Sequence, residues 1–404
     1  MYVCFILKIK FISKKLWKMG LLSVLKQSTV IHLIFAITFF TTGLITNFFQ
    51  CFLYFGLRPF SRYCYRKINY YLCYSFYTQL VFLIEWWSGS DFILYMDRND
   101  LEKHFGEEHG YILMNHSYEI DWLIGWVLCE RKGILGNCKA YVKKSLQYIP
   151  TLGWGWKFSE YIFLERNWEK DKEIIRSQIR EFGNYPDNIS LLLCPEGTRI
   201  TPQKLEASQK FAQKEGLPIL KYHLTPRTKG FTASIPYMRD KIPAIYNMQV
   251  QFKSSDSVKP TITNLLLGKR ILGHIYMQRI PMKEIPEDQE AAAEWLHKLY
   301  EKKDRMAESF EKTGDFFATS GVVKVDKITL KRRYYSLINT ICWTVIVVVP
   351  MIYYLINLFL SGSTIYFSIG IGTIFLFYIL MQKTIGISKI SSSSSYGTGD
   401  KKLK

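Results

Sequence analysis

The sequence predicts an α/β domain placed between membrane segments, and two patterns carry that prediction. Between residues 91 and 320, short apolar runs of strand length alternate with polar, helix-like stretches, which is typical of α/β folds. On both sides of this region lie apolar stretches of about 20 residues, long enough to cross a bilayer. The 404 residues leave room for one sizeable domain besides those stretches.

The first 90 residues are expected to form the N-terminal membrane region. Residues 1–18 are basic and apolar, and we interpret them as an extension ahead of Met19. A signal peptide is the weaker interpretation because no Ala-x-Ala cleavage site follows. Within residues 19–90, Thr29–Phe49 predicts a spanning helix, whereas the aromatic run Tyr70–Trp87 predicts an interfacial or re-entrant helix.

The soluble domain is expected over residues 91–325. Its predicted strands are Tyr111–Met114, Ile189–Cys194, Ile219–Leu224, Ala244–Phe252 and Ile271–Ile280. Its predicted helices are Glu169–Phe182, Leu205–Lys214 and Glu287–Lys312.

The chain changes character again after the soluble domain. Residues 326–385 contain two apolar stretches, Leu337–Leu360 and Ser363–Gln382, joined by a short Ser-Gly link. Because the link is short, we expect a transmembrane hairpin. Residues 386–404 include a serine run and are of low complexity, so we expect a disordered tail.

The charge of the chain limits its partners. Lys and Arg number 53 against 34 Asp and Glu, a formal net charge of +19. This favours anionic partners such as lipid headgroups, acyl-CoA phosphates or nucleic acid. Nucleic acid is disfavoured because the basic residues are spread out, with no zinc-finger spacing and no RNP-like strand. The eight cysteines form no CxxC pair and suggest no metal site, so we interpret them as reduced, structural thiols.

His116 and Asp121 follow a predicted strand that ends at Met114. On one straight helix, residues five apart point about 140° away from each other. The two side chains therefore meet only if His116 lies in the turn before a helix, which we expect to begin at about Tyr118. Asp121 would then fix the imidazole, and the free ring nitrogen would take a proton from an attacking hydroxyl. Taken alone the pair is a weak signal, because His-x4-Asp is a short and common pattern and His116 could simply cap a helix.

Four blocks in a fixed order resemble the glycerolipid acyltransferase family. They are Asn115-His116 with Asp121, Phe163–Arg166, Glu196–Arg199 and Ile242–Tyr246. Further segments are similar to the gamma/delta/epsilon branch of the 1-acyl-sn-glycerol-3-phosphate acyltransferases: Trp154–Trp156, Lys221–Leu224, Pro226–Phe231, Trp295–Tyr300 and Ser395–Gly397. The resemblance implies a mixed sheet flanked by helices, with N-terminal membrane helices and a C-terminal transmembrane hairpin.

The resemblance also implies a reaction and roles for residues. Acyl-CoA, as co-substrate without any cofactor, would acylate lysophosphatidate to phosphatidate in phospholipid biosynthesis, with His116 as general base and Asp121 as its partner. Because a carboxylate repels phosphate, Glu196 is expected to orient Arg199 or another basic group. The residues implied in substrate binding are Arg166, Glu196, Gly197, Thr198 and Arg199 for the phosphate, and Pro243 for the acyl or CoA site.

Two alternatives and a location remain as expectations. The acceptor could be another lysophospholipid, such as lysophosphatidylinositol, or the protein could be an idle lipid-binding membrane scaffold. The sequence has no Gly-x-Ser-x-Gly elbow, which disfavours a covalent acyl-enzyme. We expect a multi-pass protein of the endoplasmic reticulum with its catalytic domain and C-terminus in the cytosol. Lys401 and Lys402 resemble a dilysine retrieval signal, although two ordinary solvated lysines would look the same.

Overall fold

The computed structural model describes residues 20–389, so the extension 1–18, the serine run and the terminal lysines lie outside the described residues. Within that range the strands form one sheet in the order β4-β3-β5-β2-β6-β7-β1-β8. The strands are β1 (Asp91–Tyr95), β2 (Gly110–Met114), β3 (Cys138–Lys143), β4 (Ile162–Leu164), β5 (Ser190–Leu193), β6 (Ala244–Gln251), β7 (Leu272–Pro281) and β8 (Lys327–Ile328).

The sheet is mixed, as the sequence predicted. Strand β2 runs parallel to both β5 and β6, with Gly110 opposite Ser190 on one side and Ala244 on the other. Only β6 with β7 and β1 with β8 pair in the antiparallel sense among the described strands. Because β2 and β5 are parallel and in register, the chain leaves both strands at the same edge of the sheet.

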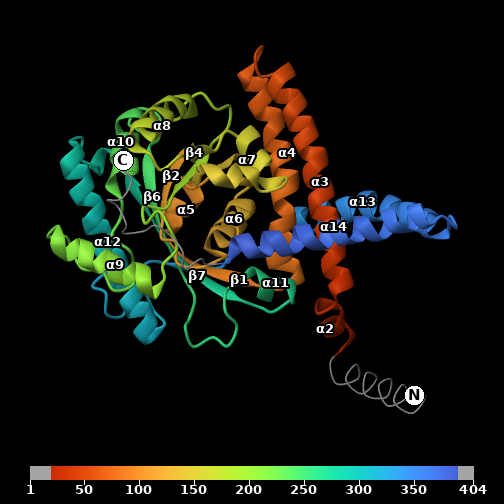
Figure 1. Cartoon of the computed structure of the whole chain (residues 1–404). Coiled ribbons are helices and arrows are strands. Elements are labelled where there is room, and N and C mark those ends of the chain that lie inside the picture. Colours follow the sequence, from red (N-terminus) through yellow and green to blue (C-terminus); the bar gives the residue numbers. More distant parts are fainter. Residues whose placement is uncertain (1–19, 390–404) are drawn as a thin grey trace.

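Helices cover both faces of the sheet (Figure 1). One face packs against α4 (Arg62–Phe82), α6 (Asp121–Arg131) and α7 (Leu152–Phe158), around a core that includes Ile112 and Met114. The other face packs against α8, α10 and α12 around Tyr111 and Leu113. The helices of the domain are α5 (Arg98–Lys103), α6 (Asp121–Arg131), α7 (Leu152–Phe158), α8 (Trp168–Phe182), α9 (Pro202–Lys214), α10 (Thr228–Met238), α11 (Ile262–Leu266) and α12 (Gln289–Thr313), with short turns at Leu135–Asn137, Lys144–Tyr148 and Met282–Glu284.

One predicted strand is absent. The segment Ile219–Leu224 is irregular, and its backbone amides are bonded to side chains instead of a neighbouring strand. The N–H groups of Lys221 and Tyr222 donate to Asp304, and the N–H of Leu224 donates to Glu196. The apolar run therefore reflects burial of Leu220 and Leu224 rather than membership of the sheet.

Three helices are long and apolar enough to cross a membrane: α3 (Thr29–Gly56), α13 (Tyr335–Leu360) and α14 (Thr364–Ser388). In α3, one exposed stripe consists of large apolar side chains, including Phe48, Phe52 and Phe55. Such a stripe is unfavourable in water and favourable against lipid tails. Figure 1 shows α13 and α14 as a pair that meets α3, while the short helix α2 (Leu21–Lys26) precedes α3.

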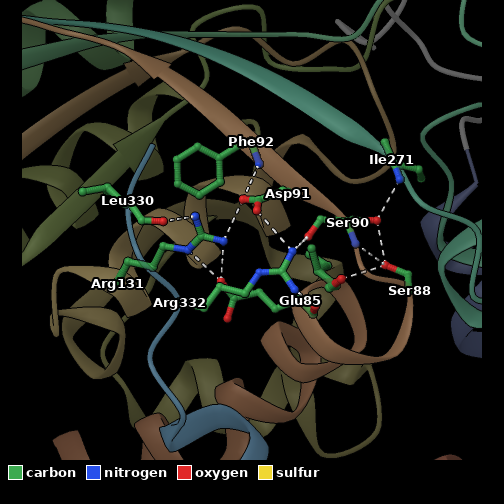
Figure 2. A network of polar contacts seen from close by, with 10 residues as sticks. Glu85, Ser88, Ser90, Asp91, Phe92, Arg131, Ile271, Leu330 and Arg332 are labelled. Carbon is green, nitrogen blue, oxygen red and sulfur yellow. Dashed lines mark hydrogen bonds and ion pairs between the residues drawn. The ribbon is translucent and has the colours of Figure 1, made fainter. Parts of the chain in front are cut away.

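The aromatic run before the domain forms α4 (Arg62–Phe82), followed by a π-helical turn at Leu83–Trp87. This turn belongs to a polar network that joins four parts of the chain (Figure 2). The guanidinium of Arg131, at the end of α6, lies 2.6 Å from Glu85 and 2.8 Å from Asp91 in β1. Arg332, ahead of α13, pairs with Asp91 at 3.1 Å. Two acids and two bases thus connect both membrane regions to the domain.

Candidate active site

The site is built where β2 and β5 end. His116 follows β2 after one intervening residue, Asn115, whose side chain bonds both backbone groups of Val250 in β6. Asn115 thereby prolongs the pairing of β2 with β6 and fixes where the next residue starts. Glu196 follows β5, and its carboxylate accepts a hydrogen bond from the backbone N–H of His116 at 3.0 Å.

Asp121 is the first residue of α6, so the helix begins three residues later than the predicted start at Tyr118. Its carboxylate lies 3.0 and 3.1 Å from Nδ1 of His116. It also accepts from the backbone amides of Ser117, Tyr118 and Trp122 at 2.9, 3.0 and 2.7 Å. These contacts hold a fully buried carboxylate at a helix N-terminus, where a negative charge is favourable.

The geometry determines which nitrogen of His116 is available. A carboxylate only accepts hydrogen bonds, so Nδ1 carries the proton that is donated to Asp121. Nε2 then has a lone pair, and the side chain is 23% exposed and lines a cavity. The arrangement can accept a proton at Nε2 while Asp121 stabilises the resulting imidazolium.

The cavity next to His116 has a volume of about 590 Å³. Most of its wall is apolar, and it passes along α6, where Trp122, Gly125, Trp126 and Cys129 line it in successive turns. Side chains of α3 and of the last turns of α14 complete the wall. Among the described residues, the lining contains no Asp or Glu but does contain Lys139, Lys143, Arg166, Arg199, Lys204 and Lys389. Such a wall suits a ligand with a long apolar part and an anionic part.

Three cationic side chains gather beside the base. Arg166 follows β4 with a left-handed backbone (φ 63°) and donates from Nη2 to the carbonyl of Gly197 at 3.1 Å. Lys204 donates from Nζ to Oγ1 of Thr198 at 3.0 Å. Burial first, and then the charges of Arg166 and Arg199, lower the pKa of Lys204. Like charges held this close are stabilised by a bound anion.

The loop after β5 depends on a glycine at position 197. Gly197 has a φ of 68°, the left-handed region that favours glycine. A Cβ at Gly197 would lie 3.3 Å from Cδ of Arg227. Arg199 donates from Nη1 to the backbone carbonyl of Ser388, the last residue of α14. Gly197, Thr198 and Arg199 all line the cavity.

Glu196 has a different surrounding from the one expected. In the described part of the chain no hydrogen bond or ion pair joins Glu196 to Arg199; its two carboxylate oxygens accept from the amides of His116 and Leu224, at 3.0 and 3.3 Å. The side chain is fully buried and does not belong to the cavity lining. Burial raises its pKa, and the nearby His223 is the first of the groups that oppose this. Glu196 therefore braces the loop that carries His116 and does not touch the cavity.

The structure does not bring Pro243 to the site. It is an exposed residue just before β6, opposite the start of β2, and His116 follows the far end of β2. Its carbonyl accepts from the N–H of Met282 at 2.8 Å. It is absent from the cavity lining, so its block supports the sheet rather than an acyl or CoA subsite.

The structure also places the tryptophans and the cysteine near the predicted blocks. Trp156 is buried and lines the cavity, whereas Trp154 is half exposed. Burial, followed by the charges of Asp121 and Glu196, raises the pKa of the Cys194 thiol, which argues against a thiolate nucleophile. Within residues 20–389 no group of three His, Cys, Asp or Glu side chains is placed to hold a metal ion.

Lys204 was missed by the sequence reasoning. It lies in the first turn of α9, directly after the Glu196–Arg199 block. Side chains in a helix lean toward its N-terminus, so a basic residue there points back at the preceding loop. That rule is the signal that finds Lys204.

The chain is similar to known acyltransferases. Residues 98–233 match the family model described as Acyltransferase, and residues 264–343 match the one described as Acyltransferase C-terminus. The 1-acyl-sn-glycerol-3-phosphate acyltransferase gamma of Mus musculus is 38% identical over 387 residues, which cover 96% of this chain and 100% of that protein. The delta enzyme of Rattus norvegicus is 39% identical over 391 residues, 96% and 99% of the two chains.

A solved structure is also similar, that of the 1-acyl-sn-glycerophosphate acyltransferase PlsC from Thermotoga maritima. The match has a TM-score of 0.40 and 14% identity, and covers 69% of this chain and 95% of that chain. The sequence relatives are the stronger finding, because they extend over nearly the whole chain. On their identity and on the Acyltransferase model across the site, the chain belongs to the family of 1-acyl-sn-glycerol-3-phosphate acyltransferases, in the branch of the gamma and delta enzymes.

Proposed function

We propose that this acyltransferase moves an acyl group from acyl-CoA to the sn-2 hydroxyl of lysophosphatidate and so forms phosphatidate. The observation that carries the proposal is the cavity wall. It joins His116 to an apolar channel and to the cations Arg166, Arg199 and Lys204, with no carboxylate among the described lining residues. Lysophosphatidate offers the matching parts, namely an acyl chain, a free hydroxyl and a phosphate.

The proposed mechanism is direct transfer. The sn-2 hydroxyl oxygen attacks the thioester carbonyl carbon while Nε2 of His116 takes the hydroxyl proton. The carbon–sulfur bond of the tetrahedral intermediate then breaks, and the CoA thiolate leaves and receives that proton. Asp121 stabilises the imidazolium between the two steps. General-base assistance of this type contributes about 10²–10⁴-fold to the rate.

The phosphate of the acceptor is assigned to Arg166, Arg199 and Lys204. A guanidinium offers two parallel donors to phosphate oxygens, and a lysine adds a point charge. Gly197 and Thr198 shape the loop between these cations. The acyl chains are assigned to the apolar channel along α6 and toward α3. No cofactor takes part in the proposal, and acyl-CoA is a co-substrate.

We further propose that the enzyme works in the endoplasmic reticulum membrane with its catalytic domain and C-terminus in the cytosol. Acyl-CoA is cytosolic and cannot cross a bilayer unaided. A hairpin of α13 and α14 returns the chain to the side it left, and Lys331, Arg332 and Arg333 precede the hairpin, in line with the positive-inside tendency.

A panel of acceptors tests the proposal on the full chain in lipid nanodiscs. Release of CoA is measured with lysophosphatidate, lysophosphatidylinositol and lysophosphatidylcholine as acceptors. The proposal expects the highest kcat/KM with lysophosphatidate. A preference for lysophosphatidylinositol would make that lipid the acceptor in place of lysophosphatidate. No CoA release with any acceptor would favour the idle scaffold. The complete His116–Asp121 pair argues against the scaffold, because lipid binding alone needs no base.

A further inference from the structure

A cluster of buried polar side chains lies behind the catalytic loop, on the face of the sheet that α12 covers. Burying a polar group costs free energy unless the group is hydrogen-bonded, so the contacts within this cluster matter. None of these side chains lines the cavity. The members of the cluster, all between 0% and 9% exposed, are Glu196, His223, Asn247, Gln249, Lys303 and Asp304.

Asp304, on α12, fixes the irregular segment that precedes Leu224. Its carboxylate accepts from the backbone amides of Lys221 and Tyr222, at 2.8 and 2.7 Å. It also pairs with Nδ1 of His223 at 3.0 Å. Burial would raise the pKa of Asp304, but the hydrogen bond and charge of His223 and the two amides lower it overall. The carboxylate is thus well satisfied, and the segment 221–223 is held at three points.

The contacts continue from this segment to the base. The next residue, Leu224, donates its N–H to one oxygen of Glu196 at 3.3 Å. The other oxygen of Glu196 accepts from the N–H of His116 at 3.0 Å. Hydrogen bonds therefore connect Asp304 to the segment 221–224, this segment to Glu196, and Glu196 to His116.

Lys303, the neighbour of Asp304 on α12, reaches the same loop from the other side. Its Nζ donates to the carbonyls of Met248 at 2.5 Å and Leu113 at 3.3 Å. Leu113 is the penultimate residue of β2, two positions before Asn115. Burial lowers the pKa of Lys303 to about 7, and the charge of Glu196 opposes this shift. Two adjacent residues of one helix thus hold the strand that enters the catalytic loop and the segment whose next residue, Leu224, bonds Glu196.

We propose that Asp304, His223 and Lys303 are positioning residues for acyl transfer, which fix His116 through Glu196 and through the end of β2. The proposal rests on the transfer function assigned above. A general base must stand within hydrogen-bond reach of its proton, and a displacement of about 1 Å can cost on the order of 100-fold in rate. Loosening this support should therefore lower kcat and leave substrate binding intact.

A partly buried network at the opposite end of β2 provides a control. Glu108 lies 2.8 Å from Arg279 and accepts from the hydroxyl of Tyr246 at 2.7 Å. This carboxylate precedes the start of β2, at the opposite end of the strand from His116. Removing its charge disturbs a comparable network without reaching the catalytic loop.

The experiment compares Asp304→Asn, His223→Leu and His223→Asn with Glu108→Gln, all as full-length protein in nanodiscs. Turnover per folded molecule and the KM of each substrate are measured, with the unfolding midpoint as the record of stability. We expect Asp304→Asn and His223→Leu to lower kcat about 10- to 100-fold with both KM values unchanged. His223→Asn should recover part of the loss, because its amide replaces the Nδ1 donor. Glu108→Gln should lower the midpoint and leave kcat unchanged.

A double-mutant cycle separates positioning from a general weakening of the fold. If the cluster acts through His116, Asp304→Asn should cost little further rate in an Asp121→Asn background. Additive losses, or equal losses in Asp304→Asn and Glu108→Gln, would overturn the proposal. If Asp304→Asn does not fold, His223→Leu and Lys303→Met give the same comparison. Wild-type protein without transferase activity would instead refute the proposed function, which is a separate outcome.

Discussion

Asp121 lies 3.0 Å from Nδ1 of His116 and at the same time accepts backbone hydrogen bonds from Ser117 and Tyr118, between the two residues, and from Trp122 in α6. One carboxylate therefore organises both the base and the loop that carries it. Asp121→Asn keeps the size of the side chain but presents an amide to Nδ1, which disfavours the productive tautomer. We expect His116→Ala to lose about 100- to 10,000-fold in kcat and Asp121→Asn to lose most of its activity.

Steady-state rates with acyl-CoA and lysophosphatidate check this prediction, with circular dichroism as the test of folding. His116 is part of a turn and contributes little to the core, so folding should survive. A His116→Ala protein that retains more than about a tenth of wild-type turnover would remove His116 from the role of base.

Replacing the cations beside His116 should affect the KM for lysophosphatidate more than the KM for acyl-CoA. Arg199→Lys replaces a planar fork by a point charge, so it should raise the KM for lysophosphatidate more than the KM for acyl-CoA. Arg166→Ala and Lys204→Met should behave in the same way, because both side chains line the same wall. Kinetic titration of each substrate separately provides the measurement, and an equal rise in both KM values would contradict the phosphate assignment.

The size of the side chain at position 125 should determine how long an acyl chain the proposed channel accepts. Gly125 stands one turn after Asp121 on α6 and lines the cavity, and a Cβ added there would have no atom within 4 Å. The glycine thus leaves open space where other residues would place a side chain. We expect Gly125→Leu to shift the preference toward shorter acyl chains, measured over a series of acyl-CoA lengths.

The control is Gly230→Leu in α10, where an added Cβ is equally unhindered and the cavity is not involved. Gly125→Ala should retain activity and gain up to about 1 kcal/mol in helix stability. A uniform loss over all chain lengths in Gly125→Leu would point to damage of the helix instead of a narrower channel.

The Arg131–Glu85 pair should matter for stability (Figure 2). Both side chains are 0% exposed, and Arg131 also holds Asp91 and the carbonyl of Leu330. Arg131→Met leaves two carboxylates without their shared partner, and breaking a buried pair in this way costs about 3–5 kcal/mol. Thermal unfolding in nanodiscs measures the loss. Arg98→Met, which removes an exposed pair with Glu102, should change the midpoint very little.

The orientation of the chain can be tested with a C-terminal tag. In sealed microsomes, protease should remove the tag without detergent, because a hairpin returns the chain to the side of the catalytic domain, which we propose is the cytosolic side. Changing Lys401 and Lys402 to serine should release part of the protein to later compartments. A tag that is protected until detergent is added would contradict the proposed topology.

The sequence predicted those parts of the site that depend on local order. His116 and Asp121 meet because a strand, a turn and a helix follow each other within a few residues, and this order can be read from the apolar pattern. The α/β class and the apolar helices follow from the same kind of pattern. The short strands β4 and β8, of three and two residues, offer too little alternation to be recognised.

Contacts between distant segments escaped prediction. Asp304 meets His223 across 81 residues, and no local pattern encodes that distance. Glu196 was expected to orient Arg199 or another basic group, and its two carboxylate oxygens are instead bonded to backbone amides. Pro243 was assigned to the site from its block, whereas the register of β6 against β2 places it at the other end of the sheet. These outcomes depend on how strands pair, which residue types alone do not specify.

The last turn of α14 meets Arg199 through the carbonyl of Ser388. A helix that is longer or shorter than the hydrocarbon layer around it adjusts its tilt. Because the end of α14 is bonded to a side chain that lines the cavity, such a change in tilt would move one wall of that cavity. We therefore expect the rate of acyl transfer to depend on the thickness of the surrounding bilayer.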